Sequence, residues 1–165
     1  MNSANTDRAV ITVCLAPPDF DDWVQVRALI LDAFAYMDAR INPPSSALRL
    51  TSSSMQADAA RGALLLAYRI NDLVGCVFAQ ARGDAFYIGK LAVRPDLQGA
   101  GIGRKLVEAA RDEARRRSLT MLELQTRIEL TENHATFARM GFVKTGETAH
   151  EGFERPTSIT MRARV

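Results

Sequence analysis

The segment RPDLQGAGIGRKL, residues 94–106, contains three glycines within five positions and leads directly into a stretch with helical periodicity. Glycine has no Cβ atom, so such a turn lets backbone N–H groups approach a ligand closely. The first four N–H groups of a helix have no partner within it, and the helix dipole favours an anion at that end. The segment therefore predicts either a capping loop or a backbone cradle for a phosphate group.

The spacing of these glycines separates the known kinds of phosphate loop. Gly99, Gly101 and Gly103 are two residues apart, whereas a dinucleotide-binding turn requires Gly-x-Gly-x-x-Gly. A nucleotide-triphosphate loop requires Gly-Lys followed by Ser or Thr, but Lys105 follows Arg104 and precedes a leucine. The pattern therefore points away from NAD and from ATP.

Composition describes an ordinary globular chain. Its 165 residues are 47% hydrophobic and 24% charged, with 21 Lys and Arg against 19 Asp and Glu. A net charge of +2 argues against nucleic acid as a partner. We interpret the arginines at 111 and 115–117 as the solvated face and last turn of a helix. The longest purely apolar run, residues 63–68, is too short to cross a membrane.

The N-terminal segment and the two cysteines indicate how many domains the chain has and where it is located. MNSANTDRA lacks the apolar core of a secretory signal, so we expect residues 1–9 to be a disordered tail and residues 10–165 a single domain. Neither Cys14 nor Cys76 has a second Cys or a His at metal-ligand spacing. We therefore expect buried free thiols, no metal site and a cytoplasmic location.

Alternating periodicities predict a mixed α/β fold in which strands precede and follow a helix at the glycines. Three strand-like runs separated by turn pairs predict an antiparallel meander, and the helix after the glycines should join two parallel strands by a right-handed crossover. A Ser- and Pro-rich segment, residues 42–62, predicts an irregular second helix near an acceptor-binding lid. The expected elements are a strand at 10–16, a helix from 23 to 34, strands at 63–70, 73–81 and 85–93, a helix at 103–117, a strand at 120–126, a short helix at 132–140, and strands at 142–148 and 157–163.

Together with the strand before it, the glycine-rich segment resembles a known motif. Gln98-x-x-Gly101-x-Gly103 directly after LAVRP is similar to the acyl-CoA-binding motif of the GNAT superfamily of N-acetyltransferases, and the element order resembles that family over nearly the whole chain. The resemblance implies the acyl-CoA N-acyltransferase fold, a mixed, mostly antiparallel sheet of six to seven strands flanked by about four helices. It also implies acetyl-CoA (coenzyme A) as co-substrate, and it makes a homodimer an expected assembly because dimers are frequent in the family.

The resemblance also implies where the cofactor binds. The loop and helix start would hold the pyrophosphate of coenzyme A, and the fourth strand would splay from the fifth so that its backbone donors stabilise the oxyanion. The implied cofactor-binding residues are Leu91, Ala92, Val93, Gln98, Gly99, Ala100, Gly101, Ile102, Gly103, Arg104, Asn133 and Phe137.

A second segment, LTENHATFARMGF at residues 130–142, resembles the short helix of the family. Carried over by position, Asn133 would face the pantetheine arm or the sulfur, with simple capping of the helix start as the alternative. Many relatives have a tyrosine four residues before the glycine of this segment, whose hydroxyl can protonate the departing thiolate. Here that position is Phe137, which cannot donate a proton, so the proton donor stays open.

An amine must lose a proton before it attacks a thioester, so a base or a chain of waters is required. Strand alternation predicts Tyr87 on one face with Gly89, Leu91 and Val93, and some protein-acetylating relatives have a glutamate at its position. The alternative for Tyr87 is an ordinary half-buried strand tyrosine. His150, in a polar loop with a pKa ordinarily near neutrality, is the other candidate base, and its alternative is to shape the loop.

We therefore predict direct transfer of an acetyl group from acetyl-CoA to a primary amine, on a small molecule or a protein, in a ternary complex. Neither cysteine lies in the motif segments, which disfavours an acyl-enzyme. The candidate catalytic residues are Tyr87, His150 and Asn133, while Glu123 and Gln125 either reach the cleft or face solvent. Two alternatives stay open: an acyl-CoA-binding sensor or catalytically weak paralogue, and an adaptor associated with nucleic acid.

Overall fold

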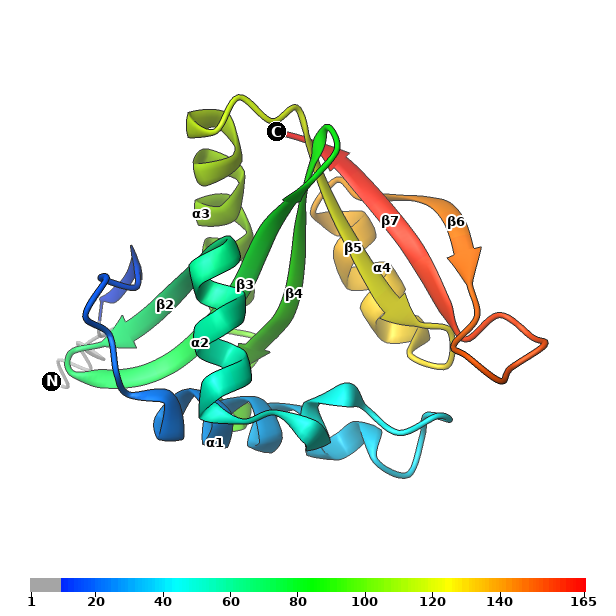
Figure 1. Ribbon diagram of the computed structural model, residues 1–165, viewed down its shortest axis with the longest axis horizontal. Helices are drawn as coiled ribbons and strands as arrows, with labels where there is room; N and C mark the ends of the chain where they lie inside the picture. The colour runs from blue at the N-terminus through cyan, green and yellow to red at the C-terminus, as the bar shows by residue number, and fades with distance from the viewer. Residues whose placement is uncertain (1–9) are drawn as a thin grey trace, which may run out of the picture.

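A seven-stranded sheet runs through the molecule in the order β1-β2-β3-β4-β5-β7-β6 (Figure 1). The computed structural model describes residues 10–165, and the predicted tail at 1–9 lies outside the described residues. Neighbouring strands are antiparallel except β4 and β5, which are parallel, so the predicted mixed, mostly antiparallel sheet is confirmed. The strands are β1 (Ile11–Leu15), β2 (Ala63–Arg69), β3 (Asp72–Arg82), β4 (Ala85–Val93), β5 (Met121–Arg127), β6 (Val143–Thr148) and β7 (Ser158–Arg164).

Helices cover both faces of the sheet. One face packs against α1 (Trp23–Phe34) and α2 (Ser52–Arg61), and the other against α3 (Ile102–Arg116), with α4 (Thr131–Arg139) beyond β5. The irregular helix expected within 42–62 is a 3-10 turn, Ser46–Arg49, followed by the regular α2. Thr51 begins α2 with a capping box, because its hydroxyl accepts the N–H of Ser54 while the Ser54 hydroxyl accepts the N–H of Thr51, both at 3.0 Å.

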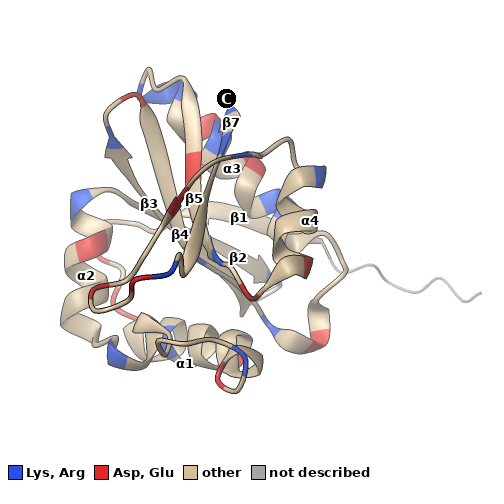
Figure 2. Cartoon of the chain, turned by 90° about the vertical axis from the view of Figure 1, so that its right-hand side faces the viewer, with Lys and Arg blue, Asp and Glu red and all other residues tan. Residues whose placement is uncertain are grey.

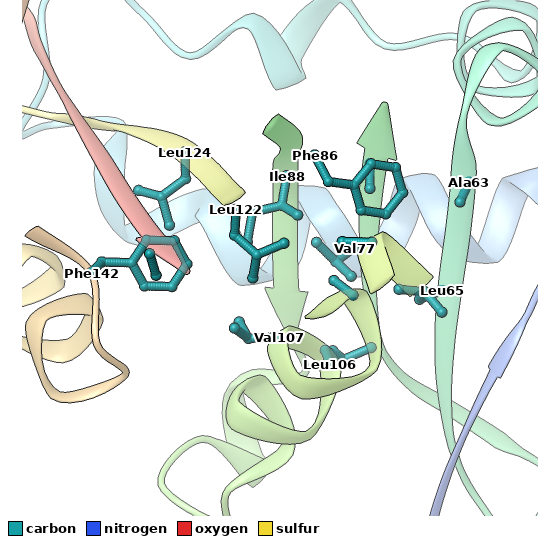
Figure 3. Packing of buried hydrophobic residues seen from close by; sticks show 14 of the residues in the cluster. Ala63, Leu65, Val77, Phe86, Ile88, Leu106, Val107, Leu122, Leu124 and Phe142 are labelled. Atoms are coloured by element: carbon teal, nitrogen blue, oxygen red, sulfur yellow. The ribbon is translucent and has the colours of Figure 1, made fainter. Parts of the chain in front are cut away.

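Each face of the sheet has its own apolar core. Beneath α3, Phe86 and Ile88 of β4 pack with Leu122 of β5 and with Leu106 of the helix (Figure 3). The core beneath α1 and α2 contains Cys76, and burial raises the pKa of its thiol to about 12. The prediction of two buried thiols is wrong for Cys14, which is exposed because β1 is an edge strand.

Gly62, at the end of α2, allows the chain to turn closely against β3. A Cβ atom at this position would lie 1.9 Å from the carbonyl oxygen of Ala79, which is backbone and cannot move aside. We expect Gly62→Ala to lower the free energy of unfolding by about 3 kcal/mol, because the added methyl group would clash with the backbone of β3 and force it to move. Chemical denaturation would measure this, and a variant as stable as the wild type would contradict the close approach.

The strands β4 and β5 pair over three positions only, from Ala85 opposite Met121 to Tyr87 opposite Glu123. Beyond Tyr87 the two strands diverge, as Figure 1 shows, which confirms the predicted splay. Every residue of β4 after this point therefore has one backbone edge without a neighbouring strand.

The arginine cluster of α3 is largely paired within its own helix. Arg115 contacts Asp112 at 2.7 Å, and Arg116 and Arg117 contact Glu113 at 2.8 and 2.9 Å. Figure 2 shows basic and acidic residues interspersed over helices and strand ends rather than gathered on one face. No helix within residues 10–165 has the length and apolar character that a membrane span requires.

Candidate active site

A cavity of about 840 Å³ follows the opening between β4 and β5. Its walls come from the glycine-rich loop, the ends of both strands, α4, the segment after α1, and the loop between β6 and β7. The segment expected near an acceptor-binding lid, residues 42–62, contributes Ser45 and Ser46, and the polar loop between β6 and β7 contributes His150. The sequence-predicted residues that line this cavity are Tyr87, Leu91, Val93, Gln98, Gly99, Gly103, Asn133, Phe137 and His150.

The remaining predicted cofactor residues lie beside the cavity rather than in its wall. Ala92 and Ile102 have buried side chains, the first in the core beneath α1 and the second in the core beneath α3. These two residues can therefore meet a ligand through backbone atoms only. Ala100, Gly101 and Arg104 are exposed within the loop and the first turn of α3.

The glycine-rich loop has the backbone geometry of a cradle. Gly99 and Gly101 have φ of +83° and +85°, in the left-handed region that favours glycine, and α3 begins immediately after Gly101. Lys105 donates the first helical N–H, to Gly101 O at 3.1 Å, so the four preceding N–H groups have no partner within the helix. A Cβ at Gly103 would meet only the Val93 side chain, at 3.8 Å, so the floor of the cradle is open.

Nothing in this loop repels an anion. Its one carboxylate, Asp96, is bonded to Arg94 at 2.7 and 3.1 Å, and this contact lowers the pKa of Asp96. The side chain of Gln98 donates to Val93 O at 3.3 Å and so ties the loop to the free edge of β4. The loop therefore fits the pyrophosphate of coenzyme A.

The end of β4 contains a bulge that changes which side chains share a face. Gly89 is opposite Phe78 whereas Ala92 is opposite Cys76, so β4 carries one extra residue, and Lys90 has φ of +52°. Leu91 and Val93 consequently pack with the core beneath α3. Tyr87 and Gly89 instead face Asp58 of α2. The prediction that Tyr87, Gly89, Leu91 and Val93 share one face is therefore wrong.

Asn133 lies in the third position of α4 and does not cap it. The N-cap is Leu130, without a side-chain cap among the described residues, so the capping alternative is wrong. The Asn133 amide instead donates to the Tyr36 hydroxyl at 3.1 Å, across the cavity mouth. One turn further along α4, Phe137 lines the cavity and packs edge-to-face on Phe142, with ring centroids 5.8 Å apart.

His150 is held by Thr157, a buried residue at the start of β7. The Thr157 hydroxyl accepts the backbone N–H of His150 at 2.8 Å, contacts Nδ1 of its ring, and lies 3.4 Å from Thr148 O. Nδ1 is thus held by the Thr157 hydroxyl, and Nε2 is the ring nitrogen without a hydrogen-bond partner in the described part of the chain. Burial, together with the positive charge of Arg127, lowers the pKa of His150, so its ring is neutral at neutral pH.

Tyr87 is mostly buried, and Arg82 stacks over its ring with 3.7 Å between guanidinium carbon and ring centroid. Burial raises the pKa of Tyr87, so its hydroxyl stays protonated and can donate a hydrogen bond but not act as a base. Of its neighbours on β5, Gln125 lines the cavity, whereas Glu123 pairs with Arg162 at 3.2 Å. The other histidine, His134, donates from Nε2 to Arg127 O at 2.9 Å and does not line the cavity.

Several residues of the cavity escape prediction from sequence. The segment after α1 lines the cavity with Tyr36 and Met37, and both terminal nitrogens of the Arg40 guanidinium donate to the carboxylate of Glu132 on α4. Arg127 also lines the cavity. The alternation of side chains along β5, which places Glu123 and Gln125 on one face, would place Arg127 on the same face and could have identified it from the sequence.

Comparison with known proteins agrees with this geometry. Residues 23–142 match the sequence profile described as the Acetyltransferase (GNAT) family. The chain belongs to this family. A GNAT relative from Azospirillum brasilense, described as an IAA acetyltransferase, is 32% identical over 99 residues, which are 59% of this chain and 64% of that protein. The aligned region thus spans less than two thirds of that relative's length.

Solved structures show the same GNAT fold. An IAA acetyltransferase from Bacillus cereus is 19% identical with a TM-score of 0.68, and the alignment covers 94% of this chain and 100% of that one. The PaiA N-acetyltransferase from Thermoplasma acidophilum in complex with coenzyme A is 11% identical with a TM-score of 0.76, over 93% and 99% of the two chains. At these identities the likeness establishes the fold alone, and the predicted acyl-CoA N-acyltransferase fold is confirmed.

Proposed function

We propose that this GNAT protein transfers an acetyl group from acetyl-CoA to a primary amine by direct attack in a ternary complex. One observation carries the proposal: a single cavity connects an open glycine-rich cradle with a neutral histidine through the gap between β4 and β5. Family membership and the coenzyme A complex of a structural neighbour support acetyl-CoA as the donor.

The residues of this chain divide the work of binding. The N–H groups of residues 101–104 would bind the pyrophosphate, with the dipole of α3 behind them. The free edge of β4 around Leu91 offers N–H donors to the thioester oxygen, which becomes negative in the tetrahedral intermediate. Asn133 and Phe137 would flank the pantetheine arm and the sulfur.

The chemistry requires one proton to leave the amine and one to reach the sulfur. The amine nitrogen forms a bond to the thioester carbon, and the carbon–sulfur bond breaks. Nε2 of His150 would take the amine proton, directly or through a water, because Nδ1 is already engaged by the Thr157 hydroxyl. Phe137 cannot return a proton to the thiolate, so water is the proposed donor, and Tyr87 would hydrogen-bond the acceptor through its hydroxyl.

The test is release of free thiol from acetyl-CoA with a broad panel of amines, together with direct measurement of acetyl-CoA binding. Amine-dependent thiol release supports the transferase. Tight acetyl-CoA binding without turnover of any amine would overturn it in favour of the sensor alternative. Binding of DNA or RNA with a steep salt dependence would be needed for the adaptor alternative.

We expect Phe137→Tyr to raise kcat about tenfold or more where departure of the thiolate limits the rate. A hydroxyl at this cavity-lining position would supply the missing proton donor, and general acids contribute about 10²–10⁴-fold. Steady-state thiol release at saturating substrate would measure the effect. An unchanged kcat, with acetyl-CoA affinity intact, would indicate that water already protonates the thiolate fast enough.

A further inference from the structure

Arg127, the last residue of β5, brings a guanidinium group into the wall of the cavity that His150 also lines, here called its acceptor end. It follows Glu123 and Gln125 at alternate positions, so it lies on the sheet face opposite α3, the face that also carries Tyr87. One guanidinium nitrogen, Nη2, donates to Pro43 O at 2.7 Å and to Pro44 O at 3.0 Å. These two carbonyls fix the plane of the guanidinium at the cavity wall.

The other guanidinium nitrogen is unsatisfied. Nη1 of Arg127 is buried and has no hydrogen-bond partner within residues 10–165. Arg127 also forms no ion pair in the described part of the chain: the nearby carboxylate of Glu129 raises its pKa, yet the two charges are not in contact. Desolvation dominates and lowers the pKa of Arg127. An unpaired buried donor on a charged group is unfavourable unless a ligand completes it.

The other charges in the cavity wall near Arg127 already have partners. Glu132 supplies the acidic group of the lining and is bound at both oxygens by Arg40, while Lys90 lies 3.4 Å from Asp58. His150 is neutral, as its lowered pKa requires. Arg127 therefore presents an open donor to the cavity, while the carboxylate that acts on its charge, Glu129, lies outside the cavity wall and 3.7 Å from Arg155.

The geometry points to an acceptor that carries a carboxylate, which binds Nη1 of Arg127 while the amine of the same molecule faces His150. Arginine to carboxylate is a charge-assisted hydrogen bond of high specificity. Arg127 lies four residues beyond Glu123, past the last position at which β5 pairs with β4, and it lines the same cavity as Leu91. The carboxylate would thus sit across the gap from the oxyanion donors, which suits a small amino acid. This inference rests on the proposed function.

The experiment compares acids with their matched amides. Thiol release from acetyl-CoA is measured with the twenty free amino acids and with the corresponding amino-acid amides, which keep the amine and remove the negative charge. We expect kcat/KM for the preferred amino acid to exceed that of its amide by about 10- to 100-fold in the wild type. In Arg127→Gln that ratio should fall to near one, because the acid loses its charged partner and the amide does not.

A binding measurement keeps the test independent of turnover. Saturation-transfer NMR on the coenzyme A-loaded protein compares N-acetyl-amino acids with N-acetyl-amino-acid amides, in the wild type and in Arg127→Gln. Binding of the acids that Arg127→Gln removes supports the carboxylate site, even if the proposed transfer fails. Equal use or binding of amides and acids, or an acid preference that survives in Arg127→Gln, would overturn it, and so would absence of both turnover and binding.

Two controls separate recognition from structure. Arg111→Gln removes another arginine that donates to two backbone carbonyls, Arg164 O and Met140 O, without lining the cavity, and should keep the acid-to-amide ratio. Arg127→Lys retains the charge but changes the donor geometry and should keep part of the preference. If O-phosphoethanolamine is acetylated faster than every amino acid, the anion is a phosphate and the carboxylate assignment is wrong.

Discussion

Gly103→Glu is expected to weaken acetyl-CoA binding about 100-fold or more and to leave the protein as stable as the wild type. Gly103 is in the first turn of α3 with an ordinary helical backbone, and a Cβ there meets only Val93 at 3.8 Å. The helix therefore tolerates a side chain, and an acidic group near its N-terminus is favourable for the fold. The same carboxylate would occupy the cradle and repel the pyrophosphate.

A loss of acetyl-CoA affinity without a loss of stability is the result that a phosphate cradle predicts and a mere capping loop does not. Isothermal titration calorimetry with acetyl-CoA and thermal unfolding of the unliganded protein would measure the two quantities. Gly146→Glu is the matched control, since Gly146 in β6 has open space around it, no positive φ and no place in the cavity wall. Unchanged affinity in Gly103→Glu would show that the glycines serve only the turn.

His150→Ala is expected to lower kcat by about 10²–10⁴-fold, the usual contribution of a general base. The pH dependence gives the sharper readout. Because the pKa of His150 is lowered, the neutral ring persists to more acid pH than for an ordinary histidine, and the wild-type rate should decline only below that ordinary value. In His150→Ala this acid decline should disappear.

The same lowered pKa affects the fold. The unfolded chain binds the proton more readily than the folded one, so His150 makes the folded state less stable as pH falls through the ordinary histidine range. The second histidine of the chain provides the control: His134→Gln changes a contact to Arg127 O outside the cavity wall and should keep the acid decline of the rate. If His150→Ala retains the wild-type profile, another group takes the amine proton.

Local sequence patterns predicted the elements and the cradle because both depend on neighbours in the chain. Glycine spacing, capping residues and periodicity act over a few positions, and the bounds of the strands and of α3 agree to within a residue or two. The parallel contact of β4 with β5 also followed, since a strand, a helix and a strand in succession have few ways to pack.

The features that prediction missed depend on contacts distant in sequence. The bulge at Lys90 is invisible to alternation because only the partner strand reveals an extra residue. Asn133 looks like a cap until Tyr36, from the segment after α1, provides a different partner. Arg127 is an ordinary strand-end arginine in the sequence, and its orientation comes from carbonyls more than eighty residues away.

The short pairing between β4 and β5 also links the stability of the fold to cofactor binding. Three residue pairs are the whole of the backbone ladder that joins the first four strands to the last three. A cofactor lodged in the gap would touch both parts at once, from the loop before α3 on one side to α4 on the other. Binding energy is then also folding energy, because a ligand that binds only the assembled state stabilises it by mass action. A higher concentration of cofactor should therefore also lengthen the time that the protein stays folded, because the same gap between β4 and β5 binds the cofactor and joins the two parts of the sheet.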